Sequence, residues 1–300
     1  MKFRQTLSSV LLSYRGQIRL FLIPYILGSL ILIVLPALAT TAVAFTEYNT
    51  MSTPTWNGLE NFRSLIESPV VRISVRSSLI FLLTAVPLRL LAALLLALLL
   101  QQKRRFFGLH RAVVYLPTII PEVAYALIWL WIFNPLYGPL NIILTWLGLP
   151  APAWLVEPDT AVAAIIIMSL FQIGEGFVVL MAGLQTIPRS YYEAAKVDGA
   201  SSLQSFWRIT LPLILPWLLI LSFRDLLVSL QNTFTPSFVM TYGGPYYATS
   251  FIPLLVYELA FDLFDFGMAA ALLIIMYLLI LLLVFGILNL IGGVHLSDDL

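Results

Sequence analysis

A polar segment, Tyr192-Glu193-Ala194-Ala195-Lys196-Val197-Asp198-Gly199, interrupts a sequence that is otherwise very apolar. Its Glu, Ala and Lys residues favour a short helix, and Gly199 is suited to end it because glycine adopts positive φ without steric cost. Ser201 or Ser202 can cap a second helix, which we expect to run to Pro212. The segment therefore predicts a helix-turn-helix between two apolar segments, and its simplest interpretation is a solvated connector between membrane spans.

The composition identifies the class of protein around this segment. Of 300 residues, 60% are hydrophobic and only 10% are charged, which predicts an all-α, polytopic membrane protein. The net charge of +1 implies no attraction to nucleic acid. The absence of cysteine excludes disulfides and thiolate catalysis, and the two histidines, His110 and His295, lie too far apart in sequence to suggest a metal site.

Membrane spans are expected wherever about 20 mostly apolar residues follow one another. Arg224 and Asp225 interrupt the fifth such stretch, and the first is too long for the core of a signal peptide. The expected spans are 20–45, 78–100, 112–133, 161–184, 213–230 and 268–290.

The distribution of basic residues predicts the orientation of these spans. By the positive-inside rule, the richer side is cytoplasmic, so we expect both termini and the Glu193 segment to be cytoplasmic. Only Arg63, Arg72 and Arg76 lie on the alternate side, outside the spans. The richer side carries Lys2, Arg4, Arg15, Arg19, Lys103, Arg104, Arg105, Arg111, Arg189, Lys196 and Arg208.

The spacing around Glu193 resembles a known motif. Glu193-Ala194-Ala195, then Gly199 after three residues, then Ile209-x-Leu211-Pro212 after nine more, resembles the EAA loop of ABC importer permeases. Further stretches resemble the carbohydrate-type permeases, which serve maltose, trehalose, glycerol-phosphate and lactose transport, in the order found in that family. They are Gly58-Leu59-Glu60-Asn61-Phe62, Leu116-Pro117 with Pro121, Trp129-x-Trp131-Ile132-Phe133-Asn134-Pro135 and Gly243-Gly244-Pro245, and the resemblance covers about residues 15 to 290.

This resemblance implies an architecture. We expect the type I ABC importer permease fold with six transmembrane helices over 20–292, including a coupling loop at 186–211. A cytoplasmic N-terminal segment, 1–19, and a short C-terminal tail, 293–300, complete the expected organisation. The membrane implied is the cytoplasmic (inner) membrane of a bacterium or archaeon.

The resemblance also implies partners. The chain has no G-x-x-x-x-G-K-[ST] loop and therefore no motor of its own, so it is expected to be a transport subunit and not an enzyme. ATP and Mg would be bound by two partner ATPase subunits. A homologous second permease and an extracytoplasmic solute-binding protein would complete an importer for a sugar or glycoside. A homodimer of this chain and the identity of the substrate remain open.

The segment around Glu193 is the expected contact with the ATPase. Small alanines permit close packing in a cleft of the partner, and Glu193 can pair with a basic residue there. The expected coupling residues are Tyr192, Glu193, Ala194, Ala195, Asp198 and Gly199.

The translocation path should be marked by polar groups inside the spans, because a charge at mid-membrane costs about 2.5 to 3.5 kcal/mol on insertion scales. The charged candidates include Glu122 and Arg89, although Arg89 is more simply a packed or snorkelling side chain. The candidates also include Gln172, Glu175, Phe177, Arg224, Asp225, Ser229, Gln231 and Asn232, which combine hydrogen-bonding groups with an aromatic face suited to a sugar.

Two of these candidates have an equally good structural interpretation, in which Glu175 and Arg224 form an ion pair. Arg224 and Asp225 are adjacent, so on a helix they point about 100° apart and cannot both face one partner. A neutral glycoside suits the opposed charges of Glu175 and Arg224 best, while a zwitterionic osmolyte or a phosphorylated polyol remains open.

Other classes of protein compete with the importer. In an ion-gradient-driven secondary transporter, the carboxylates of Glu122, Glu175 and Asp225 would be the proton or sodium sites. In an intramembrane enzyme, Glu175 or Asp225 would act as a general base. Neither alternative needs a coupling surface at Glu193, and the enzyme also lacks a paired His, Ser or metal constellation.

Overall fold

The computed structural model describes residues 14–101 and 107–295. Lys2, Arg4, Lys103, Arg104 and Arg105, on which part of the expected orientation rests, lie outside the described residues, as do most of the expected N-terminal segment and the end of the tail. The chain divides into two compact units, Met1–Leu65 with Leu259–Ile274, and Ile66–Glu258 with Ile275–Leu300.

The first unit contains a long apolar helix and a small hairpin. Residues Leu20–Val43 pass the length and hydropathy test for a membrane span, and none of its apolar core is buried inside the structure. Asn61, from the Gly58 to Phe62 motif, donates from Nδ2 to the backbone oxygens of Ala44 and Thr46, each at 2.9 Å. The elements are α2 (Tyr14–Ser29), η1 (Leu30–Val34), α3 (Leu35–Val43), antiparallel β1 (Thr46–Glu47) and β2 (Thr55–Trp56), α4 (Glu60–Glu67, which ends in the second unit), the end of η5 (Glu258–Asp262) and the start of α16 (Phe266–His295).

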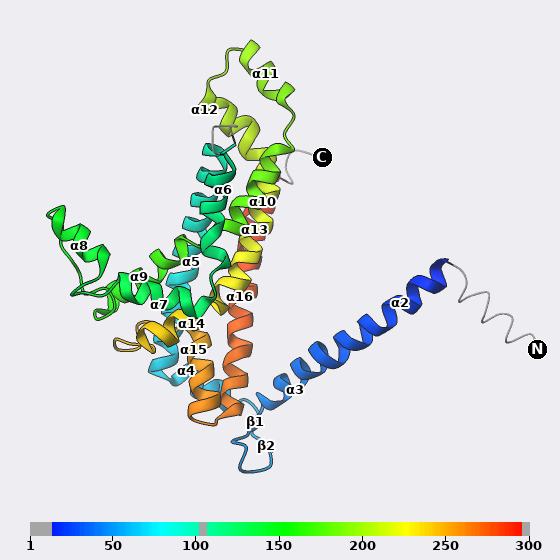
Figure 1. Cartoon of the computed structure of the whole chain (residues 1–300). Helices are drawn as coiled ribbons and strands as arrows, with labels where there is room; N and C mark the ends of the chain where they lie inside the picture. Colours follow the sequence, from blue (N-terminus) through cyan, green and yellow to red (C-terminus); the bar gives the residue numbers. More distant parts are fainter. Residues whose placement is uncertain (1–13, 102–106, 296–300) are drawn as a thin grey trace, which may run out of the picture. The chain divides into compact units, whose positions relative to one another are not determined.

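All regular secondary structure in the described part of the second unit is helical, and this unit holds the candidate site (Figure 1). Its helices before the polar segment are α5 (Pro69–Leu99), α6 (Phe107–Tyr115), the 3-10 turn η2 (Leu116–Ile119), α7 (Glu122–Ile132), α8 (Pro139–Trp146), α9 (Pro158–Leu170) and α10 (Gly174–Gln185). They are followed by α11 (Arg189–Val197), α12 (Ser202–Ser205), η3 (Phe206–Thr210), α13 (Leu211–Gln231), α14 (Phe234–Pro236), η4 (Ser237–Thr241), α15 (Ile252–Tyr257) and the remainder of α16.

The main core of this unit lies where α5 packs against α9, α10 and α13. Ala93 of α5, Phe177 and Leu184 of α10 and Ile214 of α13 are almost fully buried in one apolar cluster. Small residues on α5 let the other helices approach closely. This is usual in membranes, because lipid tails are as apolar as the helices and close packing stabilises helix association instead. This packing joins α10 and α13, the two helices that flank the polar segment.

The expected spans are present, but not all are straight. Among the described residues, four helices are long and apolar enough to cross a membrane, and the number reaches six if each of two bent helix pairs counts as one span. The expected third span bends by 100° between Gly108–Ile119 and Glu122–Ile132, and the expected fourth bends by 45° between Pro158–Leu170 and Gly174–Gln185.

The bends correct our expectation of continuous helices over 112–133 and 161–184. Pro121 is extended, with ψ of 136°, and it offers no backbone N–H to continue the helical ladder. At the second bend, Ile173 leaves helical geometry, with ψ of 1°, directly before Gly174. A Cβ on Gly174 would lie 2.9 Å from Tyr115 Cα, so only glycine permits this approach of α10 to α6.

Candidate functional site

The polar segment forms a short helix with defined ends. α11 covers Arg189–Val197, after Pro188 in extended geometry, and Gly199 follows with φ of +73°. Ser201 then caps α12 through a reciprocal pair of hydrogen bonds with Gln204, at 3.3 Å and 2.8 Å. This confirms the predicted helix, its glycine stop and the serine cap.

The second helix does not end near Pro212, as we expected, but continues as one helical run, Ser202–Thr241. A π-helical turn, η3, precedes the proline, and in it the Leu211 N–H donates to the Phe206 oxygen. Pro212 has no N–H to donate, and the wider turn carries the chain past this missing bond. The polar segment is therefore joined directly to α13.

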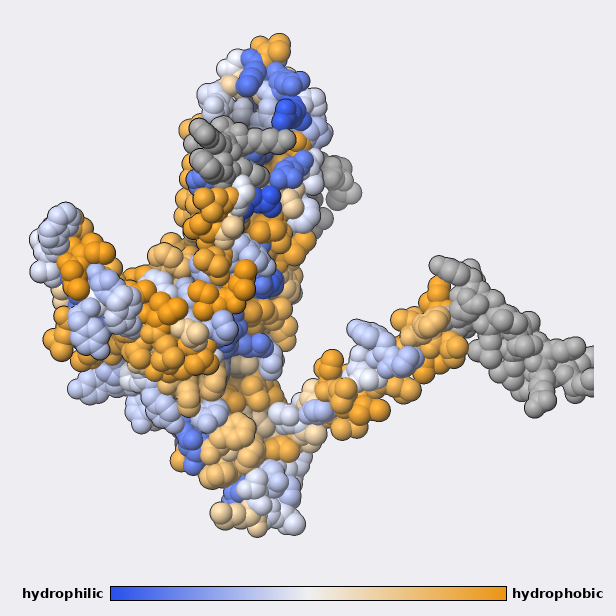
Figure 2. Space-filling model, in the orientation of Figure 1, coloured by the Kyte–Doolittle hydropathy of each residue, from blue (hydrophilic) through white to orange (hydrophobic). Residues whose placement is uncertain are grey.

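One side of α11 packs against the core, and the other side is exposed. Tyr192 is half-buried against the apolar cluster, and its hydroxyl lies 2.9 Å from Thr210 Oγ1. Glu193, Ala194, Asp198 and Gly199 are exposed, and Ala195 is half-buried. α11 and α12 lie at one end of the second unit (Figure 1), where hydrophilic side chains gather (Figure 2). The exposed side is thus open to a partner.

A polar cavity of about 310 Å³ lies further along the same helices. Its size is within the range of small-molecule sites. It receives side chains from α5, η2, α7, α10 and α13, and from the bend between α9 and α10. The polar residues that line it are Arg89, Thr118, Glu122, Gln172, Glu175, Arg224, Asp225 and Asn232.

Two ion pairs join four of the five charged residues of this cavity. Arg224 pairs with Glu175, and these side chains are 44% and 50% exposed. Arg89 Nη2 lies 2.9 Å from Asp225 Oδ2, and these side chains are only 9% and 19% exposed. Arg224 Nη1 also lies 3.7 Å from Asp225 Oδ1, which links the pairs. Arg224 and Asp225 therefore have different main partners, as their helical offset requires, and both partners belong to this chain.

Arg89 is a packed side chain, as we expected, and it also makes polar contacts that we did not predict. It is buried, and it donates to Ser229 Oγ as well as pairing with Asp225. Its Nε is buried without a hydrogen-bond partner in the described part of the chain. The side chain thus ties α5 to α13 beneath the cavity.

Three expected path residues do not line this cavity. Phe177 is fully buried in the core, because two helical positions place it about 200° around α10 from Glu175. Ser229 is also buried and accepts from Arg89. Gln231 is exposed at the end of α13, outside the cavity wall. The aromatic face that we expected Phe177 to supply is therefore not available there.

Two polar residues of the site were not among those we expected. Thr118 lines the cavity from η2, and Thr235 Oγ1 donates to Glu122 Oε2 at 2.9 Å. Glu122 begins α7 directly after the 100° bend, so the bend brings it to the cavity. Pro117 and Pro121 were the signal in the sequence that could have predicted this bend, because prolines at this spacing indicate a turn.

The helical membrane architecture and the polar cavity between its helices fit a polytopic transport protein, and the type I ABC importer permease fold that the motifs predicted is supported by the following comparisons. Residues 89–292 match the model of a family described as binding-protein-dependent transport system inner membrane component, and the chain belongs to this family. The family is an inner-membrane transporter component and not a family of enzymes.

Two relatives illustrate the similarity of sequence. The chain is 34% identical to the probable ABC transporter permease protein YesP of Bacillus subtilis, over 87% of this chain and 85% of that one. It is 31% identical to the trehalose/maltose transport system permease protein MalF of Thermococcus litoralis, over 87% and 89% of the two chains.

A solved structure illustrates the similarity of fold. A chain of a bacterial ABC transporter involved in the import of the acidic polysaccharide alginate superimposes with a TM-score of 0.82, over 99% of this chain and 100% of that one. The sequence identity is 22%, so this likeness concerns the fold alone.

Proposed function

We propose that this chain forms half of the translocation path of an ATP-driven importer for a sugar or glycoside, and that it receives force from the ATPase subunits through the loop 186–211. The observation that carries the proposal is the connection of α11 at both ends. α10 precedes it and carries Glu175, and the continuous run into α13 carries Arg224. A displacement of α11 is therefore transmitted to both sides of the polar cavity.

The exposed residues of α11, α12 and η3 suit a contact with an ATPase subunit. Val197, Leu203 and Trp207 are 88%, 68% and 59% exposed, beside exposed Glu193. Exposed apolar side chains on a solvated loop are typical of a surface that a partner covers. An acidic residue among them can add a pair with a basic side chain of that partner. In this proposal the two ATPase subunits bind ATP and Mg, and this segment lies on the cytoplasmic side.

The cavity also indicates that a second permease completes the path. Arg224 and Glu175 are about half exposed within the membrane-spanning helices, where contact of a charge with hydrocarbon is costly. A mainly apolar groove of about 500 Å³ adjoins Arg224, with Ile220, Phe223 and Leu227 in its wall. A helix of a homologous subunit in this groove would close the cavity against lipid.

A sugar or glycoside is the substrate class that fits the relatives and the cavity together. The name of the Thermococcus relative gives trehalose and maltose, and the solved structures concern alginate import, one of them in complex with an alginate-bound periplasmic protein. The cavity carries carboxylate, guanidinium and amide groups, which bind hydroxyls through hydrogen bonds. Because Glu175 offsets the charge of Arg224, a neutral glycoside is favoured over an anion.

Purification of this chain from its native membranes tests the assembly. We expect to recover a nucleotide-hydrolysing subunit and a second permease. We also expect addition of the loaded solute-binding protein to stimulate ATP hydrolysis. Recovery of the chain alone, with transport driven by an ion gradient in the absence of ATP, contradicts the proposal. Family membership does not favour that ion-gradient alternative.

The coupling role of Glu193 predicts a large effect of charge reversal. Glu193→Lys should lower the stimulated ATPase activity roughly tenfold or more, because a close charge pair at an interface couples by about 1.5 kcal/mol or more. Glu47→Lys, a reversal at an exposed residue of β1, is the matched control and should leave the activity unchanged. Full stimulation in an inserted Glu193→Lys protein excludes the proposed role.

A further inference from the structure

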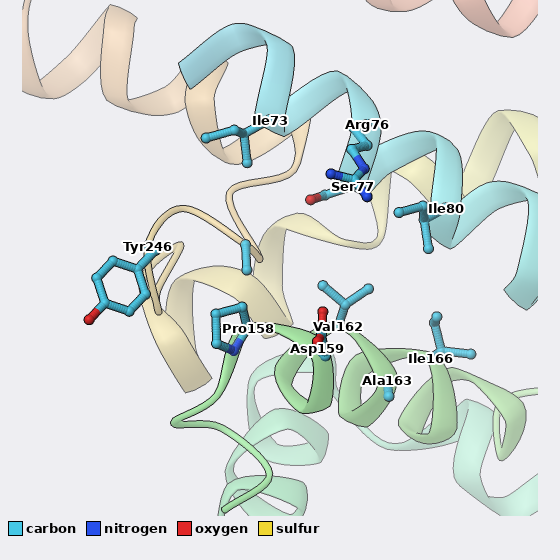
Figure 3. Close-up of a pocket in the computed structure, with 11 residues that line it drawn as sticks. Ile73, Arg76, Ser77, Ile80, Pro158, Asp159, Val162, Ala163, Ile166 and Tyr246 are labelled. Atoms are coloured by element: carbon cyan, nitrogen blue, oxygen red, sulfur yellow. The ribbon is translucent and has the colours of Figure 1, made fainter. Parts of the chain in front are cut away.

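A second pocket, separate from the polar cavity, lies between α5 and α9. Its volume is about 380 Å³. Figure 3 shows Arg76 and Ser77 of α5 facing Asp159, near the start of α9, across this space. None of these three residues lines the polar cavity or belongs to the coupling loop. They therefore lie outside both features on which the proposed function rests.

The pocket combines charged groups of both signs with apolar walls. Arg76 and Asp159 both line it and are both exposed, and in the described part of the chain neither forms an ion pair or side-chain hydrogen bond. Apolar side chains continue the wall along the two helices: Ile73, Ile80, Val162 and Ile166. Such a surface suits a ligand with a cation, an anion and an apolar chain.

The position of the pocket along α5 indicates its depth in the membrane. α5 has 31 residues, which at about 1.5 Å per residue is longer than the roughly 30 Å of hydrocarbon. Arg76 lies within the first two turns or so of α5, ahead of the expected span 78–100. Tyr246, which is 86% exposed, also lines the pocket, and tyrosine is typical of the headgroup region. The charges are therefore at headgroup level, and the apolar wall extends toward the hydrocarbon.

We propose that this pocket binds a zwitterionic glycerophospholipid with a primary ammonium headgroup, in the leaflet on the side of the membrane opposite α11. The guanidinium of Arg76 binds the phosphate, and the carboxylate of Asp159 accepts from the ammonium. An acyl chain lies along Ile80 and Ile166. Phosphatidylethanolamine has this chemistry, whereas phosphatidylcholine lacks the N–H donors and diacylglycerol lacks both charges.

Binding of these lipids to the purified importer complex, followed by native mass spectrometry, tests the proposal. We expect phosphatidylethanolamine to be retained more strongly than phosphatidylcholine or diacylglycerol. Arg76→Gln and Asp159→Asn should each weaken its retention by about fivefold, as expected for one charge near the membrane surface. Arg72→Gln and Glu157→Gln are the matched controls, because these residues are exposed, lie close by in sequence and do not line the pocket. Equal retention of the three lipids, or unchanged retention in the two pocket variants, overturns the proposal.

A pocket-filling variant distinguishes a lipid from a protein occupant. Ala163 lines the pocket from α9 and is half-buried, so Ala163→Trp should exclude the lipid while both charges remain. We expect loss of phosphatidylethanolamine from an importer that still assembles. Loss of assembly with undiminished lipid retention shows that a partner polypeptide occupies the pocket, and it overturns the proposal. If the tryptophan variant fails to fold, the charge variants decide.

Discussion

The two ion pairs of α13 differ sharply in exposure, although their α13 residues are neighbours in sequence. Arg224 and its partner Glu175 are 44% and 50% exposed, whereas Asp225 and its partner Arg89 are 19% and 9% exposed. The helical offset of about 100° between adjacent residues directs one pair to the open side of the cavity and the other to the contact of α5 with α13. One turn of α13 thus carries both a candidate ligand contact, Arg224, and a residue that links two helices, Asp225.

This difference in exposure distinguishes a structural charge from a functional one in a membrane protein. A buried pair loses its solvation, and its members depend on each other and on further hydrogen bonds. Arg89 meets this condition, since it contacts both Asp225 and Ser229. In a cavity that a second permease closes against lipid, as proposed, water screens the exposed pair, which therefore gains little from its Coulomb attraction. Glu175 and Arg224 can therefore break their ion pair and bind a substrate instead, at a small cost in free energy.

Removal of one member of the buried pair should have the largest effect on stability. Asp225→Ala leaves the Arg89 charge uncompensated in the contact of α5 with α13, so we expect a loss of about 3 kcal/mol in the free energy of unfolding. The midpoint of denaturant unfolding in detergent micelles measures it.

A double variant serves as the control for this prediction. Arg89→Met with Asp225→Leu removes both charges and keeps apolar volume, so it should recover most of the lost stability. If Asp225→Ala alone is as stable as the parent protein, Asp225 is not a structural tie, and the contrast between the two pairs disappears.

Neutralisation of the exposed pair should affect substrate selection more than stability. Glu175→Gln should change the free energy of unfolding by less than about 1 kcal/mol, the usual range for exposed ion pairs. If Glu175 lines the path, transport should shift in affinity or in preference between neutral and charged sugars, by about tenfold for one altered hydrogen-bonded charge.

Glu157→Gln is the matched neutralisation, because Glu157 is exposed and lies outside the cavity. It should leave both transport and stability unchanged. A Glu175→Gln protein with low yield but unchanged selectivity would mean that Glu175 serves only as the ion-pair partner of Arg224.

Local sequence predicted the parts of the site that local chemistry determines. Gly199 at positive φ and the pairing of Ser201 with Gln204 follow from residues within four positions of one another. The partner of Arg89 lies 136 residues away, and periodicity along one helix does not identify the helix that packs beside it. Phe177 shows the same limit, because its apolar character suits either a sugar face or a core.

The bends were the other feature that sequence predicted poorly. Length and hydropathy identify a span but carry no information on its straightness. Pro117 and Pro121 are turn signals from which we predicted no bend, and the 100° angle depends on packing of the segments on either side. The fold class was predictable because its motifs recur in a known family, while the arrangement of charges had to come from the structure.

The smallest effect is expected at the hydrogen bond from Thr235 to Glu122, which extends the comparison to a third polar contact. Glu122 is exposed at the start of α7, Thr235 is half-buried in α14, and the donor and acceptor are 2.9 Å apart. Thr235→Val keeps the side-chain volume and removes only the hydroxyl, and water can replace the donor at an exposed carboxylate. We expect a change below about 0.5 kcal/mol in the free energy of unfolding, measured by the same denaturant titration. A loss comparable to that of Asp225→Ala would show that exposure does not separate the structural contacts of this cavity from the others.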